Sequence, residues 1–240
     1  MLKIIHIDND IIVIEKPAGV PTLSSPKGRD DSLAQMLLEK YEELRDIEPR
    51  GEAGLIQRLD NDTSGLIIAA RNQSSYDALS KASKNGEIKK VYLALVHGLT
   101  PQKDVVDKPI AHHPRKKDRM VVCNSAAEKT EWKGRDAKTE FVALSYYKDK
   151  IDPTKTYTLL RVTIKKGARH QIRVHLASAG YPLVGDKIYS KKSNPELQRH
   201  LLHSYGVCMK HPAAGKELCF ISTLPEELIG MIKNKTVYGM

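Results

Sequence analysis

QRLDNDTSGLIIAAR, residues 57–71, places an arginine and a carboxylate just before a turn and an apolar run. The run at 65–71 is typical of a buried strand, and the TSG turn would anchor the preceding loop to a sheet. Asp60 lies at the tip of that loop, two residues after Arg58. Rigid loops on a scaffold commonly carry functional groups. From the pattern alone, the commoner interpretation is that Asp60 or Asp62 does no more than cap the turn.

The rest of the chain contains more predicted strands than helices, in no regular alternation. Strand-like composition marks two short segments within 4–14 and further segments at 88–98, 139–148, 156–165, 201–210 and 217–222. Capping residues and helical spacing predict helices after Ser32, at 74–85, within 168–180 and from about Thr223. This order predicts an α+β fold with a mostly antiparallel sheet rather than a doubly wound parallel one.

Composition bounds the function. The 240 residues include 39 Lys+Arg against 29 Asp+Glu, a net charge of +10, with 40% hydrophobic residues. The hydrophobic share excludes wholesale disorder, and the basic balance favours a polyanionic partner, nucleic acid before membrane. We expect one domain over 1–240, within which the basic segment 101–136, carrying PRKKDR at 114–119, is an irregular insertion.

Cellular compartment and metal content are also constrained. No apolar run is long enough for a membrane span, and the amino terminus has acidic residues where a signal peptide would be apolar. We therefore expect a cytoplasmic protein. Three cysteines without a CxxC pair make a disulfide framework and a structural zinc site improbable. We interpret Cys208 and His211 as a strand thiol and a surface imidazole rather than a metal pair.

A second string, ARHQIRVHLASAGYPLVGD at 168–186, has Arg169 and Arg173 four residues apart, hence neighbours on a helix. Near a helix start the dipole favours anions, so these arginines call for a carboxylate or phosphate partner, unless they form a solvated basic face. His170 and His175 are candidate ligands or bases, although packing histidines are commoner. Tyr92, in KKVYLALVHG, is by pattern alone a core aromatic with a bonded hydroxyl.

Five strings resemble those of one family in order and in detail. They are KPAGVPTLSS (16–25), QRLDNDTSG (57–65), KKVYLALVHG (89–98), HQIRVHLASAGYPLVGDKIY (170–189) and RHLLHSYGVCMKHPAAGKELCFISTLPEEL (199–228). Together they resemble the RluA family of RNA pseudouridine synthases, from about residue 4 to residue 229. The resemblance implies a large, mostly antiparallel mixed sheet bisected by a catalytic cleft and flanked by helices and loops. It also implies an RNA substrate, no metal and no organic cofactor.

The resemblance assigns roles to individual residues. Asp60 corresponds to the family's catalytic aspartate and Arg173 to the arginine that pairs with it. Tyr92 corresponds to the tyrosine that lines the pocket, and Arg58 to the arginine that fills the gap left by the extracted base. Leu201 or Leu202 is the candidate for the hydrophobic contact with the target base.

Departures from the family pattern concern substrate contacts. Gln57 replaces the usual histidine before the arginine, Ser204 replaces an alanine, and residues 166–169 (KGAR) replace TGRT. These changes put phosphate contacts, including those of Arg169, and target choice in doubt, but not the reaction. We expect no S4-type RNA-binding domain, which some members carry before the catalytic domain, and we expect RNA affinity to come from the basic catalytic domain itself.

The chemistry matches these residue types. Converting uridine to pseudouridine breaks the C1′–N1 bond and joins C1′ to C5 with no change of redox level, so no hydride carrier is needed. An aspartate can stabilise the electron-poor sugar carbon, bond to it, or remove a proton at C2′. We expect a monomer acting on ribosomal RNA of the large subunit, on transfer RNA or on both, without a protein partner.

Three other functions stay open. The chain could be a non-catalytic RNA-binding protein that retains the fold, a metal-dependent nuclease using Asp60 and Asp62, or a basic protein that binds phosphorylated small molecules. The sequence lacks a phosphate-binding loop, which disfavours the last.

Overall fold

The chain divides by its internal contacts into two units. The first comprises Met1–Lys90 and Ser204–Thr223, and the second Val91–His203 and Leu224–Met240. The computed structural model describes residues 2–24, 31–192, 196–233 and 235–237. Two of the three unit boundaries fall inside strands, β4 (Lys89–His97) and β10 (Leu202–Lys210), and the third lies between Thr223 and Leu224. The single catalytic domain stays a prediction.

The first unit is built on antiparallel strands. β1 (Lys3–Ile7) pairs with β2 (Ile11–Lys16), and β2 pairs with β3 (Ser64–Ala70). β10 lies beside β3, and β11 (Glu217–Ile221) pairs antiparallel with β10. All seven residues of β3 are buried, which is why this segment shows an unbroken apolar run instead of alternation.

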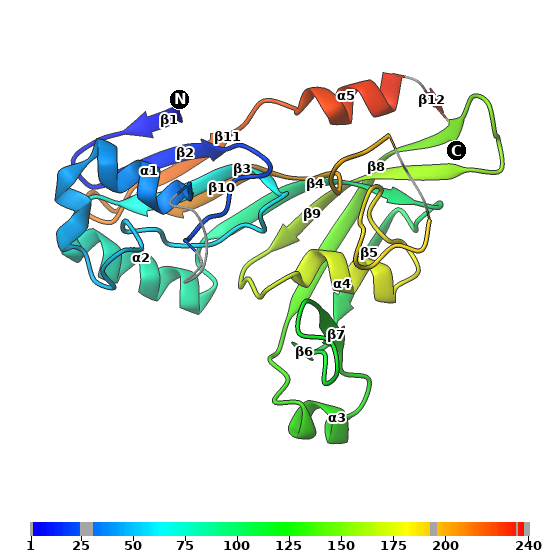
Figure 1. The fold of residues 1–240 in the computed structure, drawn as a ribbon, viewed down its shortest axis with the longest axis horizontal. Helices are drawn as coiled ribbons and strands as arrows, with labels where there is room; N and C mark the ends of the chain where they lie inside the picture. Colours follow the sequence, from blue (N-terminus) through cyan, green and yellow to red (C-terminus); the bar gives the residue numbers. More distant parts are fainter. Residues whose placement is uncertain (1, 25–30, 193–195, 234, 238–240) are drawn as a thin grey trace. The chain divides into compact units, whose positions relative to one another are not determined.

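Among the described residues of this unit, two α-helices and a short 3₁₀ helix accompany the strands. α1 (Leu33–Lys40) begins at Ser32, whose side chain accepts from the Gln35 amide, and is followed by η1 (Glu42–Asp46). The apolar spacing from Leu33 to Leu44 predicts one continuous helix, whereas the structure divides this segment into α1 and η1. α2 (Gln73–Asn85) ends at Gly86 in the left-handed conformation and lies against the strands, with Leu79 in a core shared with β2 and β3 (Figure 1).

The second unit has a strand order of its own. The remainder of β4 lies beside β9 (Thr156–Ile164), which pairs antiparallel with the twelve-residue β8 (Lys138–Asp149). β8 also pairs antiparallel with β5 (Lys103–Asp107) and β12 (Lys235–Val237). α4 (Gln171–Ser178) and α5 (Glu226–Lys233) are its longer helices.

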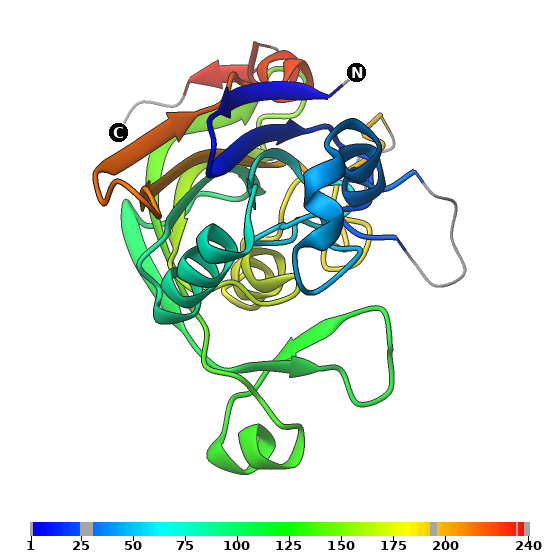
Figure 2. The ribbon, with the colours of Figure 1, turned by 90° about the vertical axis from the view of Figure 1, so that its left-hand side faces the viewer.

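The segment 101–136 is more regular than we expected. Besides β5 it contains the hairpin β6 (Ile110–His112) and β7 (Met120–Val122) and the helix α3 (Ala126–Glu131). Figure 2 shows the hairpin and α3, both green, projecting from the rest of their unit. Strands of three residues carry too little periodicity to be found by pattern, so the prediction of an irregular insertion was wrong on this point.

The cysteines also differ from expectation. Cys208 and Cys219 face each other across the β10–β11 ladder and are joined by a disulfide. The interpretation of Cys208 as a free strand thiol was wrong, because strand register, which a count of cysteines does not contain, brings the two together.

The predicted α+β class with a mostly antiparallel sheet is confirmed. Among the described residues, no helix combines the length and apolarity needed to cross a bilayer.

Candidate active site

A buried lysine binds the loop that carries Asp60. Lys16, at the end of β2, is 0% exposed, and its ammonium donates to the carbonyls of Pro17, Val20 and Asn61 at 2.9, 2.6 and 2.9 Å. The amide of Gly19 donates to the same Asn61 carbonyl at 2.8 Å. A buried ammonium requires such acceptors, so the residue after Asp60 is fixed by two donors from the 16–20 loop.

A second clamp acts on the residue before Asp60. The hydroxyl of Thr22 donates to the Leu59 carbonyl at 2.7 Å and accepts from the Leu59 amide at 3.1 Å. Both residues are buried. The turn itself is closed by the Thr63 amide, which donates to the Asp60 carbonyl at 3.0 Å. Asp60 is half-buried and Arg58 is exposed on this rigid loop.

Two of the departures from the family pattern meet at one atom. The Gln57 amide nitrogen and the Ser204 hydroxyl both donate to the carbonyl of Leu66, at 3.4 and 2.9 Å. Next to it, Gly65 has φ +112°, and a Cβ there would lie 2.2 Å from the Ser204 carbonyl oxygen. The exit of the loop into β3 therefore requires glycine and depends on Gln57 and Ser204 together.

In the second unit, Arg173 has a carboxylate partner that the sequence did not indicate. Its Nε donates to Asp186 Oδ2 at 2.8 Å and its Nη2 to Asp186 Oδ1 at 3.0 Å. The two side chains are 6% and 0% exposed. Burial alone would raise the pKa of Asp186, but the hydrogen bonds and charge of Arg173 outweigh it, so this pKa is lowered.

The other residues predicted for the site in the second unit are mostly buried. Tyr92 on β4 is 6% exposed. Leu202, the first residue of β10, is 4% exposed, and Leu201, directly before the strand, is 2% exposed. Arg169 is exposed and lies before α4, which begins only at Gln171. The prediction that Arg169 and Arg173 are helical neighbours was therefore wrong.

The two histidines of this segment differ in their surroundings. His175 is buried, with its ring nitrogens bonded to the Thr139 hydroxyl and the Lys108 carbonyl. Burial lowers its pKa, as expected of a neutral packing histidine. His170 caps the start of α4 at φ 54°, an uncommon conformation for a residue with a side chain, and its Nδ1 lies 2.9 Å from the Tyr189 hydroxyl.

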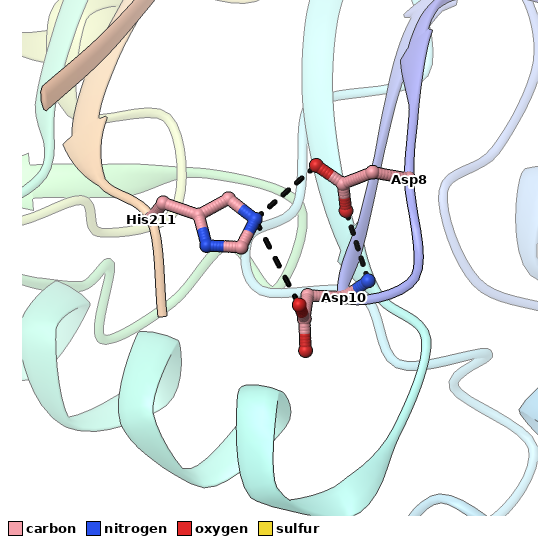
Figure 3. A group of neighbouring side chains, drawn as sticks. All are labelled: Asp8, Asp10 and His211. Atoms are coloured by element: carbon pink, nitrogen blue, oxygen red, sulfur yellow. Dashed lines mark hydrogen bonds and ion pairs between the residues drawn. The ribbon is translucent and has the colours of Figure 1, made fainter. Parts of the chain in front are cut away.

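A separate cluster lies in the first unit (Figure 3). His211 Nε2 is 3.2 Å from Asp8 Oδ2 and 3.9 Å from Asp10 Oδ2. His6 Nε2 is 2.7 Å from the same Asp8 oxygen. Among the described residues, Asp8, Asp10 and His211 alone bring three ligand-type atoms within 4.8 Å of one another. Asp8 Oδ1 is already used by the amides of Asp10 and Ile11. The cluster therefore fastens the β1–β2 turn to the end of β10, and His211 is not the surface imidazole we expected.

Sequence reasoning missed four supporting residues. Lys16 and Thr22 grip the Asp60 loop, while Asp186 and Tyr189 surround Arg173. All four lie inside strings that carry the family resemblance, 16–25 and 170–189, but none of them was given a role there. Lys16 follows four apolar strand residues and one glutamate in IIVIEK, where an exposed end is the usual interpretation. Ser25, at the end of the first motif, lies outside the described residues.

The predicted residues thus occur in two places. Gln57, Arg58 and Asp60 lie in the first unit, and the remaining five lie in the second, namely Tyr92, Arg169, Arg173, Leu201 and Leu202. The pairing of Asp60 with Arg173 stays a prediction.

Known proteins resemble the chain along most of its length. A family model described as RNA pseudouridylate synthase matches residues 10–178. Ribosomal large subunit pseudouridine synthase D of Nitrosomonas europaea is 33% identical over 240 residues, which cover 97% of this chain and 64% of that protein. The chain therefore spans just under two thirds of that relative. The uncharacterized RNA pseudouridine synthase YlyB of Bacillus subtilis is 30% identical, with 97% and 72% covered.

A solved structure shares the fold. Human RNA Pseudouridylate Synthase Domain Containing 1 aligns with a TM-score of 0.76 at 20% identity, covering 99% of this chain and 89% of the human chain.

Proposed function

The chain belongs to the RNA pseudouridine synthase family, and on that premise we propose that it isomerises uridine to pseudouridine at specific sites in structured RNA. The observation that carries the proposal is the clamped loop around Asp60. Donors from Lys16, Gly19 and Thr22 fix the residues on either side of this aspartate. Catalytic groups depend on this kind of support, because a carboxylate that acts on a substrate must keep one orientation.

Asp60 is the group that acts on the sugar. As the C1′–N1 bond breaks, its carboxylate faces C1′ and C2′, where it stabilises or bonds the electron-poor carbon or removes the C2′ proton. The uracil turns, C5 bonds to C1′, and the proton on C5 is lost while N1 gains one. Atoms and electrons balance without a cofactor.

Arg173 is the partner of this carboxylate, and Arg58 and Tyr92 handle the base. A uracil stacked in RNA must leave its stack at a cost of a few kcal/mol. Arg58, exposed on the same loop as Asp60, is available to enter the vacated space. Tyr92 contributes stacking worth roughly 1–3 kcal/mol, and Leu201 or Leu202 supplies the apolar contact.

The substrate is ribosomal RNA of the large subunit, transfer RNA or both, bound by the protein as a monomer. Named relatives act on the large ribosomal subunit according to their descriptions. Exposed basic residues in the β6–β7 turn, Arg115, Lys116 and Lys117, together with Arg169, favour contacts with RNA phosphates. Selectivity resides in 101–136 and 187–199, of which residues 193–195 lie outside the described structure.

The deciding experiment uses RNA from cells that lack the gene, labelled with tritium at uridine C5. The wild-type protein should release tritium, since C5 exchanges its hydrogen for the glycosidic bond. Asp60→Asn should release none while still shifting the RNA in a gel, and the matched control Asp62→Asn should remain active. Binding without release by the wild type would support a non-catalytic RNA-binding protein instead. Mapping of pseudouridines in the same RNA identifies the target.

A further inference from the structure

Arg173 rests in a seat made by two residues, and we propose that both of them, Asp186 and Tyr189, are positioning residues for the reaction. They fix the plane of the guanidinium, and so decide how it meets the catalytic carboxylate. This inference rests on the proposed function, in which Arg173 pairs with Asp60.

Asp186 occupies one edge of the guanidinium. It accepts from Nε and Nη2 in a two-pronged pair at 2.8 and 3.0 Å, with both side chains buried. A guanidinium has five N–H donors in a planar fork and can serve a carboxylate on each of two edges. With its Nε edge given to Asp186, Arg173 can offer a second carboxylate only the opposite edge, in one plane.

Asp186 is itself unable to swing. Its Oδ1 also accepts from the amides of Ile188 and Tyr189, at 2.9 and 3.0 Å. Its backbone carbonyl accepts from the Ser190 amide at 3.2 Å. The tight turn at 186–190 thus holds the carboxylate, and the carboxylate holds the arginine.

Tyr189 is the second residue of the seat, and its ring faces the guanidinium of Arg173. The guanidinium carbon of Arg173 lies 5.2 Å from the centre of the tyrosine ring, within cation–π range. The tyrosine hydroxyl accepts from the Met120 amide at 2.7 Å and lies 2.9 Å from His170 Nδ1. Met120 is the first residue of β7, directly after the basic 113–119 turn. One tyrosine therefore joins the base of the RNA-facing hairpin to the catalytic arginine.

The seat also changes what Arg173 supplies. A buried arginine paired with one aspartate is close to neutral as a unit, so a second carboxylate gains directed hydrogen bonds from it more than net positive charge. Orientation then limits the rate, and an error of about 1 Å at such a group can cost on the order of 100-fold.

Two variants test the seat. Tyr189→Phe keeps the ring but removes the hydroxyl link, and Asp186→Asn removes one charge of the pair. We expect single-turnover tritium release to fall roughly tenfold in the first and on the order of 100-fold in the second. RNA affinity should stay within about threefold of wild type in both, because the inference has both residues act through Arg173 and not through contacts of their own with RNA. Asp186→Glu, which restores the charge, should recover part of the rate.

Whether Tyr189 acts through Arg173 is tested in an Arg173→Lys background, where the planar guanidinium is absent. Tyr189→Phe should cause no further loss of rate there, because it acts only through the guanidinium plane. Additive losses would overturn the inference. If Asp186→Asn does not fold, the tyrosine variant alone decides.

A matched control exists in the same unit. Lys235 pairs with Asp149 at 2.6 Å and lies 4.6 Å from the Tyr157 ring centre, which reproduces the charge–carboxylate–ring arrangement elsewhere. Asp149→Asn should lower stability and leave the rate unchanged. Folded seat variants with wild-type rates, alongside an inactive Asp60→Asn, would overturn this inference alone. An inactive wild type would instead overturn the proposed function.

Discussion

The hydroxyl of Thr22 bonds both backbone groups of Leu59, donating to its carbonyl at 2.7 Å and accepting from its amide at 3.1 Å. The loop after β2 (Ile11–Lys16) thus satisfies both backbone groups of Leu59, as a neighbouring strand would. Leu59, the residue before Asp60, is thereby held by a side chain that lies 37 residues away in the sequence. This relationship makes the clamp accessible to substitution without touching Asp60.

Thr22→Val should weaken the clamp, because valine has the same shape but no hydroxyl. The buried Leu59 amide and carbonyl lose their partner, which costs about 1–3 kcal/mol in the free energy of unfolding, and turnover should slow as the aspartate gains freedom. Urea unfolding and single-turnover tritium release measure the two effects. Thr22→Ser keeps the hydroxyl and should remain near wild type; equal losses in both variants would show that the methyl group, not the hydroxyl, matters.

Lys16→Met should be more severe. The methionine fills the space of the buried lysine stem but leaves three carbonyls, among them that of Asn61, without the ammonium. Hydrogen bonds to a charged group contribute about 1.5–3 kcal/mol each, so we expect a marked loss of thermal stability and of activity. A stable and fully active Lys16→Met protein would contradict the assignment of the lysine as the support of the loop.

Stability should fall in acid through Asp8. Burial would raise the pKa of this carboxyl, but hydrogen bonds from His6, the Asp10 and Ile11 amides and His211 outweigh it and lower the pKa. A lowered folded-state pKa means stability that is present above the unfolded value, about 3.9, and is lost as the pH falls toward the folded value. The difference in unfolding free energy between wild type and Asp8→Asn should therefore shrink below about pH 4. A difference that is constant from neutral pH down to pH 2.5 would contradict the role of this carboxylate, whose ordinary pKa lies near pH 4.

Local chemistry explains which parts of the fold were predictable. Ser32 and Gly86 mark helix ends because a side-chain acceptor and a left-handed glycine act within a few residues. The buried run of β3 (Ser64–Ala70) was visible because every residue in it is apolar or small. The disulfide between Cys208 and Cys219 was not, since it depends on strand register.

The candidate site divides in the same way. Asp60, Arg58 and Arg173 were indicated by the family resemblance, which operates on short strings. Thr22 and Asp186 lie in the same strings but were given no role, because they act through contacts that no spacing rule encodes. Asp186 follows a glycine, and a Gly-Asp pair is common in loops, so the sequence offered no reason to expect a buried ion pair there.

Arg58→Ala should separate binding from chemistry. The side chain is exposed on the clamped loop, so its loss should leave stability nearly unchanged, within about 0.5 kcal/mol. If the arginine fills the space of the extracted base, the single-turnover rate should fall more than gel-shift affinity does. An equal fall in both would mean that Arg58 is only one of the phosphate contacts.

Ser204 and Gln57 offer a test of two departures from the family pattern at once. Both donate to the Leu66 carbonyl, at 2.9 and 3.4 Å, and each can serve it when the other is absent. Ser204→Ala, which installs the family's residue, should therefore cost only about 0.5–1.5 kcal/mol. Gln57→Leu should cost little as well, because the Gln57 Oε1 is buried without a partner among the described residues and its removal relieves that burden.

The double variant should lose more stability than the sum of the two, by roughly 0.5–3 kcal/mol, because only then does the buried carbonyl lack both donors. Urea unfolding of the four proteins in this cycle measures the coupling. Strict additivity would mean that the two side chains act independently, and that Gln57 stands in for the family's histidine without help from Ser204.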